Sequence, residues 1–196
     1  MKLNEIFFSI QGEGYHSGTA AVFIRTANCN FSCSFCDTDF SENMTLTGAG
    51  ILKHIKSFPV KFVVITGGEP TLQTEAISDL ISLLHTDGYY VSLETNGSSL
   101  NRMGADWITV SPKDWVDPGL CTWLCKQGDE LKLLYNKQDL SFYENSDFSH
   151  YFLQPISNSN FDLNIQQPSL QQIVEIIKKH PKWRLSLQLH KILHIQ

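Results

Sequence analysis

The sequence predicts an α/β fold, a modified and incomplete (βα) TIM-like barrel. Strand-like segments alternate with helix-like ones along the chain, which is typical of βα units and of a largely parallel sheet. The cysteine and glycine motifs described below follow predicted strands, as expected where chemistry lies at the carboxyl ends of parallel strands. Periodicity does not separate a barrel from an open doubly wound sheet. At 196 residues, however, the chain is shorter than the roughly 250 residues of a complete barrel.

The strands are predicted from runs rich in Val, Ile, Leu and aromatic residues that are bounded by Gly, Pro, Asn or Ser. These runs are residues 21–27, 61–66, 89–95, 107–110, 130–135, 151–153 and 183–189. Apolar residues three or four positions apart predict helices over residues 71–86 and 170–180, and a shorter helix is expected over residues 50–57. Residues 8–14 contain two glycines around an acid and are expected to form a loop.

Composition and charge exclude several classes of protein. One domain over residues 1–196 is expected, because the chain is short enough for a single core and no linker interrupts it. The formal net charge of −5 argues against a nucleic-acid partner, which needs a basic face. No apolar run approaches the about 20 residues that span a membrane. An acid, Glu5, stands where a signal peptide would carry positive charge, so a cytoplasmic location is expected.

Three of the five cysteines lie close together as Cys29-x3-Cys33-x2-Cys36, directly after a predicted strand. Clustered cysteines in a chain without an export signal indicate metal ligands rather than disulfides. A structural zinc site takes four ligands, usually as two close pairs of cysteines, and the sequence has no second pair of that spacing. A [4Fe–4S] cluster can use three cysteines and leave one iron open for a substrate or cofactor. Three-ligand zinc and a metal-free group of buried cysteines remain the alternatives.

With Phe35 before Cys36, this loop resembles the C-x3-C-x-aromatic-C signature of the radical S-adenosylmethionine (SAM) superfamily. Residues 66–70, Thr-Gly-Gly-Glu-Pro, are similar to the motif with which that superfamily holds the amino group of SAM. The resemblance implies a barrel of the radical SAM type with one [4Fe–4S] cluster, whose open iron binds the amino and carboxylate groups of SAM. One electron would then cleave SAM to methionine and a 5′-deoxyadenosyl radical.

Within that superfamily, the chain resembles the 7-carboxy-7-deazaguanine synthases from about residue 4 to residue 196. The resemblance is carried by Gln-Gly-Glu-Gly at 11–14, Cys-Asp-Thr-Asp-Phe at 36–40, Glu-Thr-Asn-Gly at 94–97, Ser-Pro-Lys at 111–113, Gln-Pro at 154–155 and the tail at 183–191. It implies a lyase of queuosine biosynthesis, a tRNA-modification pathway. This enzyme would convert 6-carboxy-5,6,7,8-tetrahydropterin to 7-carboxy-7-deazaguanine with loss of ammonia. The radical would abstract hydrogen from C6 of the pterin, and SAM would be regenerated.

The same resemblance implies the site residues. The implied substrate contacts are Ile10, Gln11, Gly12, Glu13, Arg25, Thr66, Glu94, Asn96, Gln188 and Gln196. The implied SAM contacts are Phe35, Gly68, Glu69, Ser111, Pro112, Lys113, Gln154, Pro155, Ile156 and Ser157. Residue chemistry supports some of them, since the guanidinium of Arg25 matches a carboxylate, and a carboxylate such as Glu13 or Glu94 matches two adjacent N–H donors. Thr38 is implied as the protein ligand of Mg²⁺, beside the substrate carboxylate and waters.

Two other functions share part of this pattern. Another small radical SAM enzyme, such as a glycyl-radical activase, would share the cysteine loop but not segment 11–14 or the tail. A non-catalytic iron–sulfur electron carrier usually binds every iron through protein cysteines and needs no SAM pocket. The resemblance further implies a homodimer and a flavodoxin- or ferredoxin-like electron donor. Cys121 and Cys125 are interpreted as buried small residues rather than ligands of a second cluster.

Overall fold

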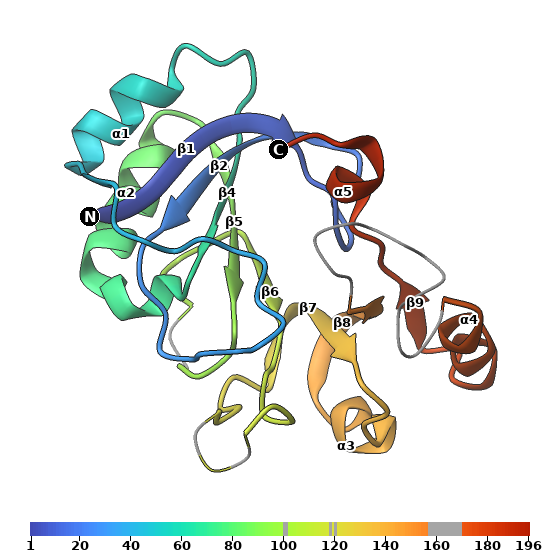
Figure 1. Ribbon diagram of the computed structural model, residues 1–196. Helices are drawn as coiled ribbons and strands as arrows, with labels where there is room; N and C mark the ends of the chain where they lie inside the picture. Colours follow the sequence, from blue (N-terminus) through green and yellow to red (C-terminus); the bar gives the residue numbers. More distant parts are fainter. Residues whose placement is uncertain (100–101, 118, 120, 157–169) are drawn as a thin grey trace.

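The computed structural model describes residues 1–99, 102–117, 119, 121–156 and 170–196 (Figure 1). Its centre is a mixed sheet made of β1 (Lys2–Ile10), β2 (Ala20–Thr26), β3 (Met44–Thr45), β4 (Phe62–Gly67), β5 (Tyr90–Thr95), β6 (Trp107–Val110), β7 (Gln127–Tyr135), β8 (Asp147–Pro155) and β9 (Trp183–Leu185). The strand order is β3-β1-β2-β4-β5-β6-β7-β8-β9. β1 pairs antiparallel with β2 and β3, and from β2 to β9 every neighbouring pair is parallel.

The sheet curves but does not close. Among the described strands, no hydrogen-bonded ladder joins the edge strands β3 and β9, so the barrel stays open on one side. Figure 1 looks nearly along the barrel and shows the opening between β1 and β9. The incomplete barrel expected from the sequence is therefore confirmed.

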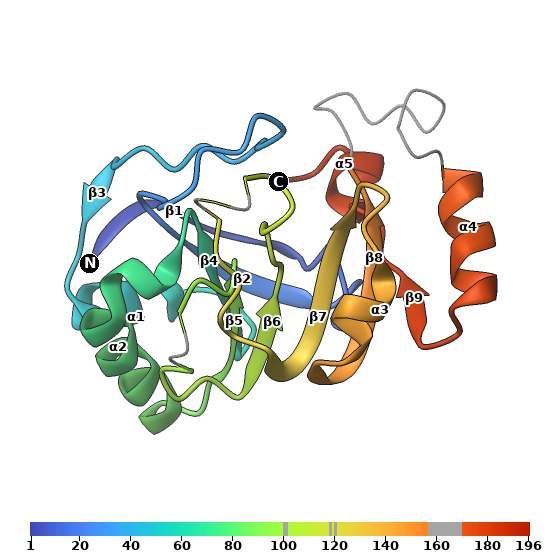
Figure 2. The ribbon, with the colours of Figure 1, turned by 90° about the horizontal axis from the view of Figure 1, so that it is seen from below.

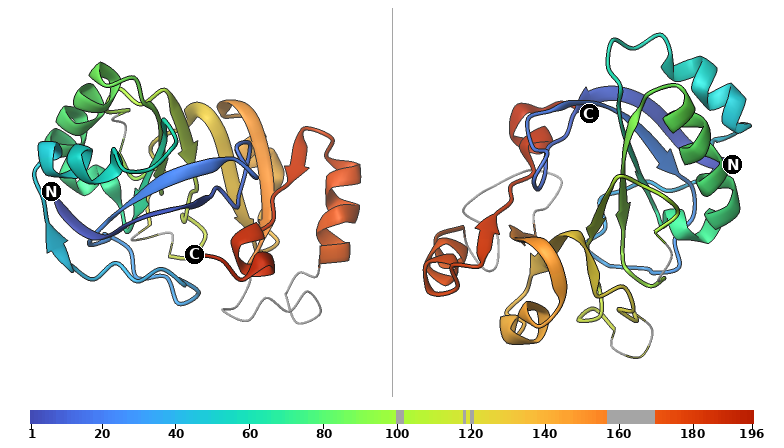
Figure 3. Two further views of the ribbon diagram at one scale, coloured as in Figure 1. Left: turned by 90° about the horizontal axis from the view of Figure 1, so that it is seen from above. Right: turned by 180° about the vertical axis from the view of Figure 1, so that it is seen from behind.

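Most of the helices lie on the outside of the curved sheet, and the last one lies at its open side (Figure 3). They are α1 (Gly48–Ile55), α2 (Thr74–Thr86), α3 (Leu140–Glu144), α4 (Leu170–Lys179) and α5 (Leu189–Leu193), with a 3₁₀ turn at Pro70–Gln73 ahead of α2. α2 buries Ile77, Leu80, Ile81 and Leu84, which recur at helical spacing and so form one apolar stripe against the sheet. α1 packs beside α2, and α4 packs against β8 and β9.

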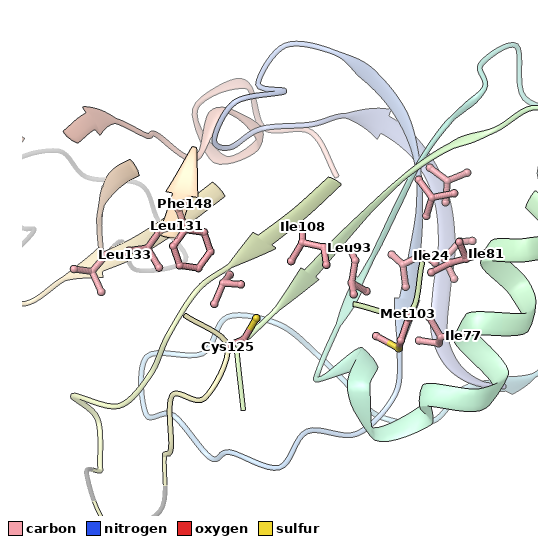
Figure 4. Packing of buried hydrophobic residues seen from close by; sticks show 14 of the residues in the cluster. Ile24, Ile77, Ile81, Leu93, Met103, Ile108, Cys125, Leu131, Leu133 and Phe148 are labelled. Atoms are coloured by element: carbon pink, nitrogen blue, oxygen red, sulfur yellow. The ribbon is translucent and has the colours of Figure 1, made fainter. Parts of the chain in front are cut away.

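Alternation along the strands separates the apolar core from the inside of the barrel. Ile24, Leu93, Ile108 and Leu131, from four different strands, belong to one core with the helices (Figure 4). Each neighbours a residue that faces the other way and lines a cavity inside the barrel: Arg25, Glu94, Thr109 and Lys132. The same strands therefore build the core with one face and the candidate site with the other.

Residues 8–10 were expected to belong to a loop, and the structure shows that this expectation is wrong. Phe8 and Ile10 belong to β1, where they pair with Val22 and Ala20 of β2. The loop begins only at Gln11, so the two glycines bend the chain after the strand rather than within it. Residues 8–10 are extended because they pair with β2. The glycines that follow them suggest a loop and do not reveal this pairing.

The predicted strand over residues 183–189 is too long. β9 ends at Leu185, and Gln188 lies at the N-cap of α5 instead of within a strand. Ser186 N still donates to Leu153 O at 2.9 Å, but Leu189 N already donates to Gly12 O at 3.0 Å. The chain leaves the sheet because its backbone groups bond to the turn after β1.

That turn and the segment before α5 bridge the opening of the barrel. Besides the bond from Leu189 to Gly12, Gly14 N donates to Ser186 Oγ at 3.0 Å. Gly14 has φ of +65°, and a β-carbon there would lie 1.9 Å from Glu130 Oε1, so both the conformation and the space favour glycine. None of the helices in the described ranges is long and apolar enough to cross a membrane.

Candidate active site

A cavity of about 620 Å³ lies inside the barrel, toward the carboxyl ends of the parallel strands. Figure 2 shows the loop after β2 and helix α5 at the same end of these strands. Of the site residues implied by the sequence, the cavity is lined by Ile10, Gln11, Gly12, Glu13, Arg25, Cys29, Cys33, Phe35, Cys36, Thr38, Thr66, Gly68, Glu94, Asn96, Ser111, Lys113, Gln154, Ile156, Gln188 and Gln196. Glu69, Pro112 and Pro155 do not line it, and Ser157 lies outside the described residues.

The three clustered cysteines reach the cavity from the loop after β2. Asn28, with φ of 69°, turns the chain out of the strand, and Cys36 N donates to Cys33 O at 3.0 Å. Cys29 and Cys33 are half-buried, whereas Cys36 is exposed. Burial raises the pKa of the Cys29 and Cys33 thiols, and at Cys33 the nearby Lys113 ammonium opposes this rise.

The chemistry and position of these thiols fit a [4Fe–4S] cluster, because three cysteines from one loop line the same cavity. A cluster held by three cysteines would leave one iron facing that cavity.

Two glycines at the end of β4 bring the backbone close to the cysteine loop. Gly67 has φ of +128°, and a β-carbon there would lie 2.3 Å from Thr26 O. At Gly68, a β-carbon would lie 1.9 Å from Asn28 O. Glu69 N donates to Asn28 O at 2.9 Å, which fastens the glycine turn to the start of the cysteine loop.

Glu69 lies behind the cavity wall, because its carboxylate is fully buried and bonded to the protein itself. It accepts from Thr71 N at 3.0 Å, from Thr95 Oγ1 at 2.7 Å and from Asn96 N at 2.7 Å. Asn96 in turn donates through Nδ2 to Asn30 Oδ1 at 2.9 Å. The carboxylate implied as a SAM contact therefore positions the end of β5 against the cysteine loop.

Opposite the cysteine loop, two carboxylates share one ammonium group. Lys132 Nζ lies 2.5 Å from Glu13 Oε2 and 3.6 Å from Glu94 Oε1. Gln188 Nε2 donates to the other oxygen of Glu13 at 2.9 Å. Glu94 accepts two hydrogen bonds from side chains. Gln11 Nε2 donates to Glu94 Oε1 at 2.9 Å, and Thr66 Oγ1, from β4, donates to Glu94 Oε2 at 3.0 Å.

The ion pair controls the charge of this wall. Burial by itself raises the pKa of Glu13, but the Lys132 ammonium and the Gln188 amide outweigh it and hold that pKa at about 2. Burial by itself lowers the pKa of Lys132, but Glu13, Glu94 and Glu130 together raise it above its usual value. Glu13 and Lys132 are therefore both charged at neutral pH.

A second polar wall runs along β1 and β2. Arg25 Nε donates to Glu5 Oε1 at 2.8 Å, and the guanidinium lies over the ring of Phe7, 5.5 Å from its centre. Gln196 Nε2 donates to the second oxygen of Glu5 at 2.5 Å. Thr38 lies on this side, next to Asp37, which forms an ion pair with Lys191. A guanidinium, a hydroxyl and two acids thus face the cavity here.

The residues implied for SAM lie between these walls. Phe35 stacks on Trp115 with ring centres 5.1 Å apart. Lys113 Nζ donates to Ser111 O at 2.6 Å and to Ser111 Oγ at 2.7 Å, and its desolvation lowers its pKa to about 8. Gln154 Oε1 accepts from Ser186 Oγ at 2.7 Å, a contact that fixes the orientation of its amide.

Several cavity residues described above were missed by the sequence reasoning, and Lys132 and Glu5 are the clearest cases. Lys132 and Glu5 each lie on a strand, next to at least one apolar residue of that strand. A charged residue that alternates with apolar ones faces away from the core, and this pattern could have marked both as cavity residues. Cys121 and Cys125 are buried, as expected, and the described residues from 121 to 126 form no helix.

Comparison with known proteins agrees with this geometry. The family model of the radical SAM superfamily matches residues 23–123, which include the cysteine loop and the glycine turn. A 7-carboxy-7-deazaguanine synthase of Bacteroides thetaiotaomicron is 44% identical over 100% of this chain and 98% of its own length. A protein of the same name from Burkholderia multivorans is 36% identical and is covered over 98% of both chains.

Solved structures show the same barrel. The crystal structure of QueE from Escherichia coli superposes with a TM-score of 0.76 and 25% identity, covering 95% of this chain and 93% of that chain. SuiB from Streptococcus suis, bound to its precursor peptide SuiA, superposes with a TM-score of 0.55 and 14% identity. That likeness covers 83% of this chain and 47% of SuiB and shows a shared fold.

Proposed function

The chain belongs to the 7-carboxy-7-deazaguanine synthase family of the radical SAM superfamily, and we propose that it converts 6-carboxy-5,6,7,8-tetrahydropterin to 7-carboxy-7-deazaguanine with release of ammonia. One observation carries the proposal. The same cavity is lined by the three cysteines, by the glycine turn and by a wall of hydrogen-bond acceptors built from Glu13 and Glu94. This is the set of groups that a cluster, SAM and a pterin would need side by side.

Bound together, a [4Fe–4S] cluster and SAM would supply a radical able to remove a hydrogen atom from carbon. Cys29, Cys33 and Cys36 would hold the cluster. The ammonium of Lys113 would stabilise the carboxylate of SAM, and the backbone at Gly68 would approach the same ligand closely. Support comes from the position of these groups around one cavity.

The substrate would bind between the two polar walls. Glu13 and Glu94 are acceptors for adjacent N–H groups, such as those of a pterin ring edge. Arg25 is a donor for the carboxylate at the other end of the substrate. Its orientation is supported by Glu5, which already holds Nε and leaves the outer nitrogens for a ligand. The pterin would thus bridge a wall of acceptors and a wall with a cationic donor.

We propose Thr38 as the protein ligand of a Mg²⁺ ion beside the substrate carboxylate. A hydroxyl together with carboxylate and water oxygens suits this hard cation, which usually keeps several waters. Thr38 lines the same cavity as Arg25, which would bind the substrate carboxylate. Titration of the purified enzyme with Mg²⁺ tests this: activity should rise with the ion, and Thr38→Val should weaken that response.

The remaining parts of the proposal concern organisation. The chain would act as a single cytoplasmic domain, assemble as a homodimer, and receive electrons from a flavodoxin- or ferredoxin-like donor. The full-length similarity to the relatives supports the single domain, and the dimer and the donor rest on the resemblance alone. Sedimentation of the purified protein tests the dimer directly.

Product analysis tests the proposed reaction. The reconstituted protein would be incubated without oxygen with reductant, SAM, Mg²⁺ and the carboxytetrahydropterin, followed by mass spectrometry. Formation of 7-carboxy-7-deazaguanine, lost in Cys33→Ser, supports the proposal. 5′-Deoxyadenosine without pterin conversion would indicate another radical SAM enzyme, and no cleavage of SAM by cluster-loaded protein would indicate an electron carrier.

A further inference from the structure

Lys132 occupies an unusual place for a cation. It lies on β7 and is only 5% exposed, while Leu131 and Leu133 beside it belong to the apolar core. Strand alternation therefore directs its side chain to the inside of the barrel, where it lines the cavity. A buried ammonium is costly unless it is paired, so its partners decide what it does.

Its partners are two acids from different elements. Glu13 comes from the turn after β1 and Glu94 from β5, and the ammonium lies between them at 2.5 Å and 3.6 Å. Their side chains keep only 14% and 22% exposure. Two partly buried carboxylates this close to one point would repel each other, and without a cation one of them would take up a proton.

The charge state decides which ligands the wall accepts. An ionised carboxylate only accepts hydrogen bonds, whereas a protonated one also donates. We propose that Lys132 is a positioning residue that keeps Glu13 ionised and holds it beside Glu94, so that this wall selects ligands with several adjacent N–H donors. The ligand class is a 2-amino-pyrimidinone edge, as in a pterin or a 7-deazaguanine, and this part rests on the function proposed above.

Other titratable groups surround the trio. Glu130 faces it from β7 and accepts from Tyr15 N at 3.0 Å, Lys113 faces it from the loop after β6, and His190 faces it from α5. Burial raises the pKa of Glu130 to about 7, so Glu130 titrates in the neutral range by itself. Any pH experiment on Lys132 therefore needs a parallel series in a Glu130→Gln background.

Binding without turnover tests the inference. Reconstituted protein with SAM but without reductant would be titrated calorimetrically with 7-carboxy-7-deazaguanine and with its analogue lacking the 2-amino group. In the Glu130→Gln background, protein that keeps Lys132 should bind with nearly constant affinity between about pH 6 and pH 8 and reject the analogue by at least about 100-fold. Lys132→Met should lose affinity, bind more tightly as pH rises, and discriminate less. Lys178→Met, which removes an exposed lysine also paired with a glutamate, is the matched control.

A double variant separates a charge effect from loss of structure. In the Glu130→Gln background, Lys132→Met with Glu13→Gln removes one charge of each sign. Of the trio a single carboxylate remains, so the pH dependence should disappear, although affinity stays reduced. If Lys132→Met does not fold, the double variant alone tests the inference. An affinity that does not change with pH supports the inference, and an affinity that still rises with pH overturns it. A folded Lys132→Met with unchanged pH profile and discrimination also overturns it. Failure of the unchanged protein to bind the product would instead overturn the proposed function, and with it the ligand named here.

Discussion

Gly68 lies so close to Asn28 that a β-carbon on Gly68 would fall 1.9 Å from the Asn28 carbonyl oxygen. The turn after β4 and the first residue before the cysteine loop therefore move as one unit. In the proposed function the cluster would lie in that loop and SAM beside that turn, so the contact would set the spacing between the two. A backbone contact, rather than a side-chain bond, makes glycine necessary at this position.

Gly68→Ala should test this contact. The added methyl group would force the two backbones apart and lower the free energy of unfolding by roughly 1–3 kcal/mol. SAM affinity, measured by calorimetry on the reconstituted protein, should fall because the turn moves relative to the cluster. Gly48→Ala is the control, because a β-carbon there meets its nearest atom at an ordinary 3.6 Å. Equal SAM affinity in the two variants would contradict the role given to the contact.

Glu69→Gln should be destabilising without removing any bulk. Glu69 accepts from three donors while fully buried, and an amide would turn an N–H group toward at least one of them. We expect a loss of about 1–3 kcal/mol in the free energy of unfolding, measured by denaturant titration. Glu175→Gln, which alters an exposed ion pair, should change it by less than about 0.5 kcal/mol. A similar loss of unfolding free energy in both variants would show that the buried carboxylate of Glu69 stabilises the fold no more than an exposed one.

Glu130 predicts a pH dependence of stability. Its pKa is raised from 4.5 to about 7, mainly by burial, so between these values the folded state keeps a proton that the unfolded chain has lost. The unfolding free energy contributed by this group therefore falls as pH rises through that range. Glu130→Gln should remove this fall, which is worth up to roughly 3 kcal/mol by pH 7. Denaturant titrations from about pH 5 to pH 7.5 measure it, and an unchanged slope would contradict the assignment.

Arg25→Lys should weaken substrate binding while leaving the fold intact. Glu5 occupies Nε of Arg25, so the forked end of the guanidinium is available for a carboxylate, and a lysine cannot form the same two bonds. We expect KM for the pterin to rise by about 10-fold or more, with a smaller change in kcat. Arg102→Lys, in an exposed pair with Asp129, should leave KM unchanged. An unaltered KM in Arg25→Lys would show that Arg25 does not bind the carboxylate.

The sequence predicted most of the parts that depend on local pattern. Cys29, Cys33 and Cys36 fall on one loop after a strand, and Gly68 falls directly after the next parallel strand, so their meeting at one edge follows from topology. The strand with Trp107 was predicted with its observed bounds, since apolar residues and flanking loops mark it clearly.

Residues defined by distant partners could not be predicted in the same way. Lys132 looks like an ordinary charged strand residue until Glu13, more than a hundred positions away, is placed beside it. The end of β9 likewise depends on Gly12, whose carbonyl takes the bond from Leu189. The carboxylate of Glu69 accepts from the backbone of Asn96, a contact between distant positions that no local pattern reveals.

The most direct test of the account counts product against SAM. The anaerobically reconstituted protein would receive reductant, SAM, Mg²⁺ and 6-carboxy-5,6,7,8-tetrahydropterin, and both 7-carboxy-7-deazaguanine and the SAM consumed would be quantified. The account predicts many molecules of product for each SAM lost, because SAM serves as a cofactor in the cavity beside the acceptor wall. SAM cleavage with the pterin left unchanged would contradict it.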